Sequence, residues 1–259
     1  MIILLSPSKG QDFAPSPFDQ YSQAVLLSQS KKLVSKLKTF KPSQLQQLMS
    51  ISEKLAELNY QRFQDFETPF KLGTAKQAVL AFKGDVYTGL EAETLTMEDL
   101  DFAQHHLRIL SGLYGYLKPL DLIMPYRLEM KTRLSNEKGE NLYHFWDKQI
   151  TGLLNEDLNN DDDFVVNLAS NEYFKAIKKP KVKAQILTLH FKDTKAGKTR
   201  VIGFFAKKAR GMMAKALIQN KINHPEVIKS VVIDGYQYND SLSKGNDWVF
   251  ERAQPEPKT

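Results

Sequence analysis

Apolar residues in this chain are gathered in short runs, and this feature most limits how the chain can fold. Residues 2–5 (IILL) and 164–169 are almost wholly apolar, and polar or turn-forming residues follow each run closely. Short apolar runs rich in β-branched residues are typical of strands that are buried on both faces. We therefore predict a buried strand at each of these two positions.

Longer segments between these runs have apolar residues at helical spacing. Residues 42–66 begin with Pro42, which suits a first helical turn, and contain a second capping pattern at Ser50 and Glu53. Helices are also predicted over 96–110, 142–154 and 207–222, and strands over 126–134, 182–191 and 200–206, the last two as a hairpin. Residues 78–82 could form either element, and we favour a strand. This pattern predicts a mixed α/β fold, in which helices flank a mixed sheet.

The length and composition are those of one globular domain. With 259 residues, 42% of them hydrophobic and 25% charged, the chain can bury a substantial core and is not expected to be disordered. It contains neither an internal repeat nor a linker. We therefore expect a single compact domain over residues 1–259, with a frayed tail at 254–259.

Several classes of site and location are disfavoured by residues that the sequence lacks. The chain has no cysteine, and its five histidines show no H-x-x-x-H spacing, so neither a metal site nor an iron-sequestering site is expected. The phosphate-binding motifs of ATPases and dinucleotide enzymes are also missing, so no organic cofactor is expected. Without a signal peptide or a membrane-spanning run, we expect a cytoplasmic protein that needs no obligate protein partner.

Positive charge is concentrated in one part of the chain. The net charge is +6, but residues 171–221 contain 14 Lys or Arg and only two acidic residues, so the remainder is acidic overall. Local clustering of this kind is typical of a surface that binds phosphates, because neutralised phosphates release their counterions. A solvated lysine-rich face is the plainer alternative.

A glycine-rich turn in the middle of the chain is the first candidate for phosphate binding. Ser111, Gly112, Leu113, Tyr114 and Gly115 are predicted to join two helices, in the manner of a helix–hairpin–helix element. The two glycines would permit a tight turn whose backbone amides bind one phosphate oxygen. An ordinary glycine cap at the end of a helix remains the alternative.

A cluster of cations is the second candidate. Lys207, Lys208 and Arg210 lie where a strand is expected to give way to a helix, inside the most basic part of the chain. Positive charge in a first helical turn opposes the helix dipole, so this placement suggests that an anion binds there. The alternative is an ordinary cationic helix face. Lys9, in the loop after the first strand, is a further candidate.

A polar loop between glycines favours a different function. Lys83, Asp85 and Tyr87 lie within a few residues of one another, and a lysine with a lowered pKa could attack a sugar carbon with Asp85 as acid or base. That would make the protein a lyase or glycosylase acting on a nucleotide, a base or damaged DNA. A turn whose polar groups cap one another is the alternative, and we name no catalytic residue on this pattern alone.

Several blocks in fixed order resemble the YaaA family of peroxide stress proteins. They include the start ILLSPSK, residues 51–56, 81–90, 106–130 (with Arg127), 167–174 and 204–211, and they span nearly the whole chain. The resemblance implies a bacterial cytoplasmic protein that limits iron-linked DNA damage, and a DNA-binding fold with a helix–hairpin–helix element in a basic cleft. Ser8 occupies a position that is often alanine in the family, which leaves the resemblance intact.

These observations together predict binding of double-stranded or structured DNA through the phosphate backbone, with little sequence preference. Lys9, Lys83 and Arg127 are expected to line the same groove as the 111–115 turn and the cations at 207–210. The preferred DNA structure, the oligomeric state and any direct effect on iron cannot be inferred from the sequence.

Overall fold

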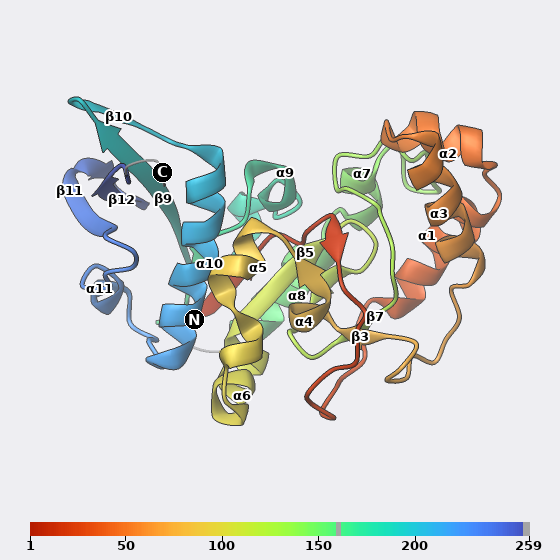
Figure 1. Ribbon diagram of the computed structural model, residues 1–259, viewed down its shortest axis with the longest axis horizontal. Coiled ribbons are helices and arrows are strands. Elements are labelled where there is room, and N and C mark those ends of the chain that lie inside the picture. Colours follow the sequence, from red (N-terminus) through yellow and green to blue (C-terminus); the bar gives the residue numbers. More distant parts are fainter. Residues whose placement is uncertain (159–161, 256–259) are drawn as a thin grey trace.

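The computed structural model describes residues 1–158 and 162–255, and its centre is an eight-stranded sheet (Figure 1). The strands follow the order β11-β12-β9-β8-β1-β5-β6, and β10 pairs with β9 outside this path. The bounds of these strands are β1 Ile2–Leu5, β5 Leu107–Ser111, β6 Gly115–Leu117, β8 Phe164–Asn167, β9 Gln185–Lys195, β10 Lys198–Arg200, β11 Gln237–Lys244 and β12 Asp247–Ala253. Two small sheets pair β2 (Gly10–Gln11) with β4 (Phe82–Lys83) and β3 (Lys76–Gln77) with β7 (Leu122–Ile123).

Five neighbouring strands of the large sheet are parallel, namely β5, β1, β8, β9 and β12. Numbered along the chain, their spatial order is 2-1-3-4-5, which is one of the two common orders of doubly wound α/β sheets. The order reverses between β1 and β8, whose registers pair Ile3 with Val166. In open sheets of this kind ligands bind beyond the carboxyl ends of the strands at that reversal. The topology therefore draws attention to the loops that follow Leu5 and Asn167.

Helices surround the sheet and extend the molecule at one end (Figure 1). α1, α2 and α3 form a cluster at one end of the long axis, whereas α10 and α11 lie at the other end with β9–β12. The helix bounds are α1 Leu27–Lys38, α2 Pro42–Met49, α3 Glu53–Gln64, α4 Ala78–Ala81, α5 Asp85–Leu90, α6 Met97–His106, α7 Leu142–Trp146, α8 Gln149–Asp157, α9 Asn171–Phe174, α10 Gly203–Gln219 and α11 Pro225–Ile228, with 3-10 turns at Ala92–Thr94 and Lys179–Lys181.

Two glycines allow α5 and α10 to pack with their backbones in contact. A Cβ atom added to Gly211 would lie 1.7 Å from the Val86 carbonyl oxygen, and one added to Gly89 would lie 2.1 Å from the Lys208 carbonyl oxygen. No side chain larger than hydrogen fits at either position. The crossing of these helices is therefore fixed by the two glycines.

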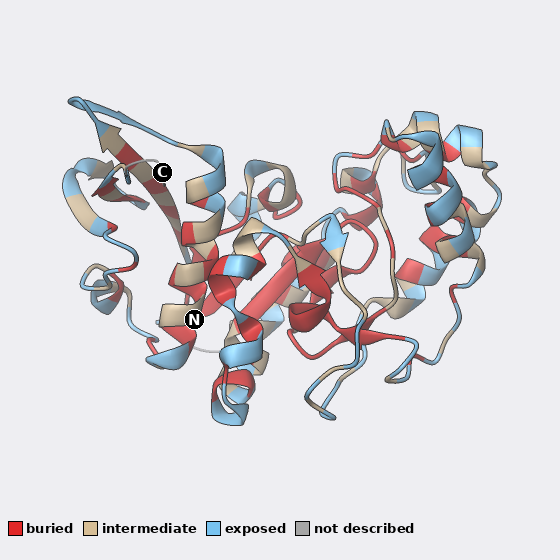
Figure 2. Ribbon diagram, in the orientation of Figure 1, coloured by how far each residue is buried: buried red, intermediate tan, exposed pale blue. Residues whose placement is uncertain are grey.

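The hydrophobic core follows the central strands (Figure 2). All four residues of β1 and all four of β8 are buried, as the short apolar runs predict. The predicted mixed α/β fold, with a mixed sheet flanked by helices, is confirmed. Of the predicted frayed tail, residues 256–259 lie outside the described part, whereas the Gln254 amide donates to the Thr194 carbonyl oxygen.

The prediction of two helices joined by a hairpin around residues 111–115 is wrong. α6 ends at His106, and the next five residues form β5, which is buried along its whole length and parallel to β1. Ser111 pairs with Gly115 in the antiparallel β5–β6 ladder, so the glycine-rich segment is the turn of a β-hairpin. A segment buried on every side has no amphipathic face, and periodicity cannot then distinguish strand from helix.

Other elements also differ from the sequence prediction. Residues 78–81 form α4, not a strand, and residues 203–206 begin α10. The predicted helix over 42–66 is broken at Ser50, which is left-handed with φ 50°. The strand predicted over 126–134 is not formed, because this segment pairs with no strand in the described part of the chain. Burial still alternates along it as predicted: Thr132 and Leu134 are buried, and Lys131 and Arg133 are exposed.

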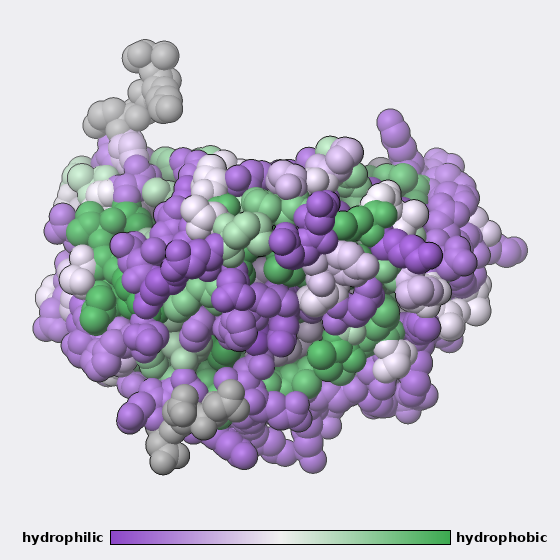
Figure 3. Space-filling view, turned by 90° about the horizontal axis from the view of Figure 1, so that it is seen from below, coloured by the Kyte–Doolittle hydropathy of each residue, from purple (hydrophilic) through white to green (hydrophobic). Residues whose placement is uncertain are grey.

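The surface in Figure 3 is mostly hydrophilic, with apolar side chains in scattered patches. None of the helices within residues 1–158 and 162–255 has the length and apolar character needed to cross a bilayer.

Candidate nucleic-acid interface

The glycine turn that sequence analysis favoured for phosphate binding is inaccessible. The hydroxyl oxygen of Ser111 accepts the backbone N–H groups of Leu113 (3.2 Å) and Tyr114 (3.0 Å), so these amides already have a partner. The Trp146 indole N–H donates to the Gly112 carbonyl oxygen at 3.0 Å, and a Cβ at Gly112 would lie 2.1 Å from the Leu128 carbonyl oxygen. Gly112 is required by close backbone packing, and this turn cannot bind DNA.

A different pair of helices, α2 and α3, forms a short helical hairpin on the surface. Ser50 ends α2 in the left-handed conformation, and Ser52 begins α3, with its hydroxyl accepting the Leu55 N–H at 3.4 Å. The capping pattern at Ser50 and Glu53 marks this break between α2 and α3, where the sequence led us to predict one continuous helix over 42–66. Because the first N–H groups of a helix have no carbonyl partner inside it, the start of α3 offers hydrogen-bond donors to solvent.

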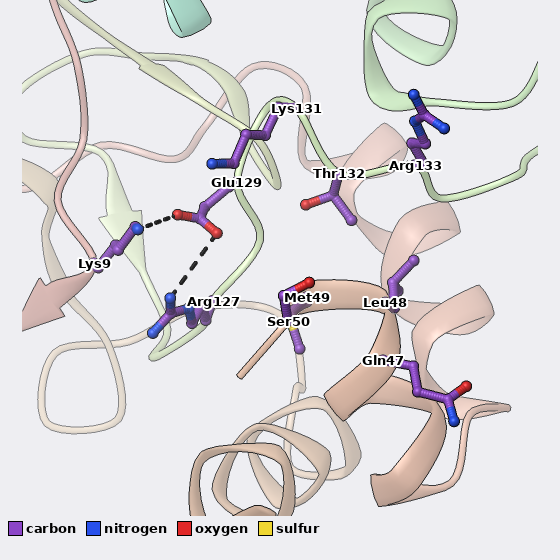
Figure 4. Close-up of a pocket in the computed structure, with 10 residues that line it drawn as sticks. All are labelled: Lys9, Gln47, Leu48, Met49, Ser50, Arg127, Glu129, Lys131, Thr132 and Arg133. Atoms are coloured by element: carbon purple, nitrogen blue, oxygen red, sulfur yellow. Dashed lines mark ion pairs between the residues drawn. The ribbon is translucent and has the colours of Figure 1, made fainter. Parts of the chain in front are cut away.

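The helical hairpin borders a pocket with a volume of about 670 Å³, which we call the basic groove (Figure 4). Its walls come from the end of α2, the loop after β1 and the extended segment 127–133. The lining residues are Lys9, Gln47, Leu48, Met49, Ser50, Arg127, Glu129, Lys131, Thr132 and Arg133. Four cations and one carboxylate give this surface a net positive charge, which favours an anionic ligand.

Glu129 lies between two of these cations (Figure 4). Its carboxylate is 2.5 Å from the Lys9 ammonium and 3.9 Å from the Arg127 guanidinium. Lys9 is 60% exposed, whereas Glu129 is almost buried. The Nε atom of Arg127 is buried without a hydrogen-bond partner in the described part of the chain. Arg127 therefore has unused donor capacity beside the groove.

A second pocket, of about 580 Å³, lies where the strand order reverses, and we call it the switch-point pocket. Lys9 and Glu129 line both pockets, so the two cavities adjoin. The lining residues are Ser6, Pro7, Ser8, Lys9, Gly84, Asp85, Val86, Glu129, Ser170, Asn171, Glu172, Tyr173, Lys207 and Arg210. The loops after β1 and β8 are joined directly, because the Ser170 N–H donates to the Ser6 hydroxyl oxygen at 2.9 Å.

The cationic candidates from the sequence are divided between these surfaces. Lys9 and Arg127 line the basic groove, and Lys207 and Arg210 line the switch-point pocket, whereas Lys208 lines neither. Much of the basic stretch 171–221 lies elsewhere: the Lys215 ammonium is 2.6 Å from Glu91, and that of Lys221 is 2.7 Å from Asp99. The concentration of charge in the sequence is therefore only partly a concentration in space.

The residues of the alternative lyase site are not brought together. The Lys83 ammonium pairs with Glu93, lies 4.0 Å from Asp12 and lines neither pocket. The Tyr87 hydroxyl donates to the Ser6 carbonyl oxygen at 3.0 Å, and burial raises the pKa of this phenol well above its ordinary value. Only Asp85 lines the switch-point pocket, 3.9 Å from the Lys207 ammonium. Lys83 is thus not placed as a nucleophile beside Asp85.

Part of the basic groove was not predicted from the sequence. Lys131 and Arg133 were assigned to a strand but not recognised as ligand-binding candidates, although their alternation with buried residues predicts that both face outward. Ser50 and Gln47 were missed because the break between α2 and α3 was missed. Within residues 1–158 and 162–255, no group of three or more His, Asp or Glu side chains is arranged to hold a metal ion.

Comparison with known proteins identifies one matching family model and several relatives of nearly the same length. Residues 1–242 match the family model described as peroxide stress protein YaaA. The chain is 52% identical over 256 residues to a UPF0246 protein of Teredinibacter turnerae and 51% identical over 256 residues to one of Colwellia psychrerythraea, in both cases covering 98% of this chain and 100% of the relative. A UPF0246 protein of Acaryochloris marina is 50% identical over 252 residues, covering 97% of this chain and 100% of that protein.

Proposed function

Because this chain belongs to the family of peroxide stress protein YaaA, we propose that it binds double-stranded or structured DNA in the cytoplasm and thereby limits oxidative, iron-linked DNA damage. DNA phosphates would lie along the basic groove, contacted by Lys9, Arg127, Lys131 and Arg133. Contacts with the phosphate backbone carry no sequence information directly, so binding should show little sequence preference.

The observation that carries this proposal is the convergence of four cations beside an exposed helical hairpin. The exposed Arg133 can form two parallel hydrogen bonds to a phosphate, and Arg127 adds a second guanidinium to the lining of the groove. Lys9 and Lys131 add compact charges. The N–H groups at the start of α3 would provide neutral donors to the same backbone.

The salt dependence of binding tests this proposal. The affinity of a fluorescein-labelled duplex, measured by anisotropy at several salt concentrations, should fall linearly on a log–log plot, with a slope of about −0.9 for each phosphate neutralised. Duplexes of unrelated sequence should give closely similar affinities. Affinity that does not change with salt, or a strong preference for one sequence, would contradict binding through the backbone.

Two double variants locate the contact. Replacing Lys131 and Arg133 by alanine should reduce the slope by about two, because each cation removed eliminates about one phosphate contact. The matched control replaces Lys195 and Lys198, which are exposed on the β9–β10 turn and line neither pocket, and should leave the slope unchanged. If both double variants reduce the slope equally, the basic groove is not the binding site.

A further inference from the structure

We infer that the switch-point pocket holds a single nucleotide unit, which enters it from DNA bound in the neighbouring basic groove. The inference that the nucleotide comes from bound DNA rests on the proposed function. The inference that the pocket fits a nucleotide rests only on the residues that line it. The residues that carry the inference lie on four separate segments: the loops after β1 and β8, the start of α5 and the first half of α10.

The position of the pocket is the first argument. β1 and β8 are adjacent and parallel. The next parallel strand after β1 lies on one side of this pair, and the next one after β8 lies on the other side. A crevice therefore forms at the carboxyl ends of β1 and β8, and doubly wound sheets bind nucleotides in this crevice. The Ser6 hydroxyl oxygen accepts the Ser170 N–H, which fixes the two loops relative to each other. The loops that form the floor of the pocket are therefore preorganised for ligand binding.

The second argument is that the guanidinium of Arg210 lines the pocket without a protein partner in the described residues. The Arg210 side chain is partly buried in the wall of the pocket, and this burial lowers the pKa of its guanidinium. In residues 1–158 and 162–255 it makes neither an ion pair nor a hydrogen bond to any side chain or backbone atom, although carboxylates line the same pocket. A guanidinium that has lost part of its water and has no protein partner is stabilised when an anion pairs with it. A phosphate group is the anion that matches its planar array of donors.

The remaining lining residues suit the rest of a nucleotide. Glu172 and Asp85 can accept hydrogen bonds from ring and exocyclic N–H groups, and the Asn171 amide can both donate and accept. Tyr173 provides an aromatic ring at the same wall. Enzymes that extrude a base from a duplex recognise it through this combination of polar contacts to its edge and aromatic contacts to its face. A volume of about 580 Å³ is ample for one nucleotide and far too small for a duplex.

The junction between the two cavities is the third argument. Lys9 and Glu129 form a wall common to both, with the Lys9 ammonium 2.5 Å from the Glu129 carboxylate. A nucleotide swung out of a strand in the basic groove would thus reach the switch-point pocket past a single ion pair, while the strand remained bound. Unpaired positions should enter most readily, because no base pair has to be broken.

The experiment uses 2-aminopurine, whose fluorescence rises when the base leaves the stack. We expect the full-length protein to increase the fluorescence of a duplex that carries 2-aminopurine in an unpaired position. Asn171→Trp, which fills the pocket from an exposed position, should reduce this response about fivefold or more, and Arg210→Met should also weaken it. Gln237→Trp, a matched introduction of tryptophan on exposed β11, should respond as the unsubstituted protein does.

The outcomes separate this inference from the proposed function. If the protein binds DNA but leaves 2-aminopurine stacked, or if Asn171→Trp responds normally, the inference is overturned while DNA binding stands. If no DNA binds, the proposed function fails, and titration with free deoxyadenosine monophosphate followed by NMR decides the nature of the pocket. Resonance shifts that Asn171→Trp abolishes would support a nucleotide pocket supplied from solution, and no shifts would overturn it.

Discussion

The Lys9 ammonium lies 2.5 Å from the Glu129 carboxylate, in the wall that separates the basic groove from the switch-point pocket. Glu129 is the one carboxylate among the residues that line the groove, and it also faces Arg127 at 3.9 Å. It therefore neutralises part of the positive charge that DNA would meet. Its position also keeps the two cations close together, although they come from segments more than a hundred residues apart in the chain.

Removing that carboxylate should strengthen DNA binding. In Glu129→Gln the groove loses its negative charge, so we expect affinity for a duplex to rise about three- to tenfold at low salt, with a steeper salt dependence. Anisotropy titrations at two salt concentrations measure both quantities. Glu137→Gln is the matched control, because Glu137 is exposed, pairs with Lys32 and lines neither pocket. Weaker binding by Glu129→Gln would show that the carboxylate organises the groove more than it repels phosphate.

Gly112→Ala should destabilise the protein without a direct effect on DNA. The added methyl group would meet the Leu128 carbonyl oxygen at 2.1 Å, and relieving that overlap should lower the free energy of unfolding by about 3 kcal/mol. Urea denaturation measures the loss. Gly152→Ala is the control, since Gly152 lies in α8 with no atom near its added Cβ, and it should stabilise the protein by about 0.5–1 kcal/mol. Equal stability of the two variants would contradict the buried position of the turn.

The helical hairpin can be tested through Ser50. With φ 50° this residue adopts a conformation that side chains disfavour, so Ser50→Gly should raise the free energy of unfolding by up to about 1 kcal/mol, and Ser50→Val should lower it by about 1–2 kcal/mol. Thermal melts of the two variants give the order directly. If valine is tolerated as well as glycine, the chain does not turn at Ser50 in the left-handed conformation.

Arg210→Met should uncouple stability from ligand binding. Since the guanidinium has no partner among the described residues, replacing it by an apolar side chain of similar length should leave the unliganded protein equally or slightly more stable. The same change should abolish the stabilisation that a bound nucleotide confers. Thermal melts with and without deoxyadenosine monophosphate compare the two states. A marked loss of stability without ligand would mean that Arg210 supports the fold itself.

The Asp99–Lys221 pair should contribute a stability that depends on pH. The ammonium of Lys221 donates to Asp99 at 2.7 Å and holds the pKa of that carboxyl below its ordinary value. A lowered folded-state pKa stabilises the protein above the unfolded-state pKa of about 4, and this contribution disappears as the pH falls through the folded-state value. Asp99→Asn should therefore be less stable by about 1 kcal/mol at pH 7 and indistinguishable near pH 2. Urea melts at the two pH values test this. A difference that persists at pH 2 would assign it to the hydrogen bond that the Asp99 side chain accepts from the Thr96 N–H at the start of α6.

The parts of the fold that were predictable are those with a clear sequence pattern. β1 and β8 follow from apolar runs that are too short for helices. β5 was not predictable by periodicity, because Arg108 and Ser111 are buried along with its apolar residues. Arg108 is satisfied by Asp157 at 2.7 Å, a partner far away in the sequence.

The candidate site was predictable in its components but not in its assembly. Lys9, Lys207 and Arg210 were identified from their local sequence, and Arg127 was identified within a block that resembles the family. Lys9 lines both pockets, and each of the other three lines one of them. Their grouping depends on the order of the strands, which no local pattern specifies. Lys215 and Lys221 lie in the same basic stretch, but they pair with carboxylates from other segments. The number of cations in this stretch of the sequence therefore exceeds the number that the folded protein presents at the two pockets.

The glycine contacts between α5 and α10 have a mechanical consequence for the switch-point pocket. α5 contributes Asp85 and Val86 to one wall, and α10 contributes Lys207 and Arg210 to the adjoining wall. Since the backbones of these helices touch at Gly89 and Gly211, neither wall can slide past the other without a collision. The two walls therefore move as one rigid unit. Any widening of the pocket that admits a ligand has to come from the opposite side, where residues 170–173 follow β8.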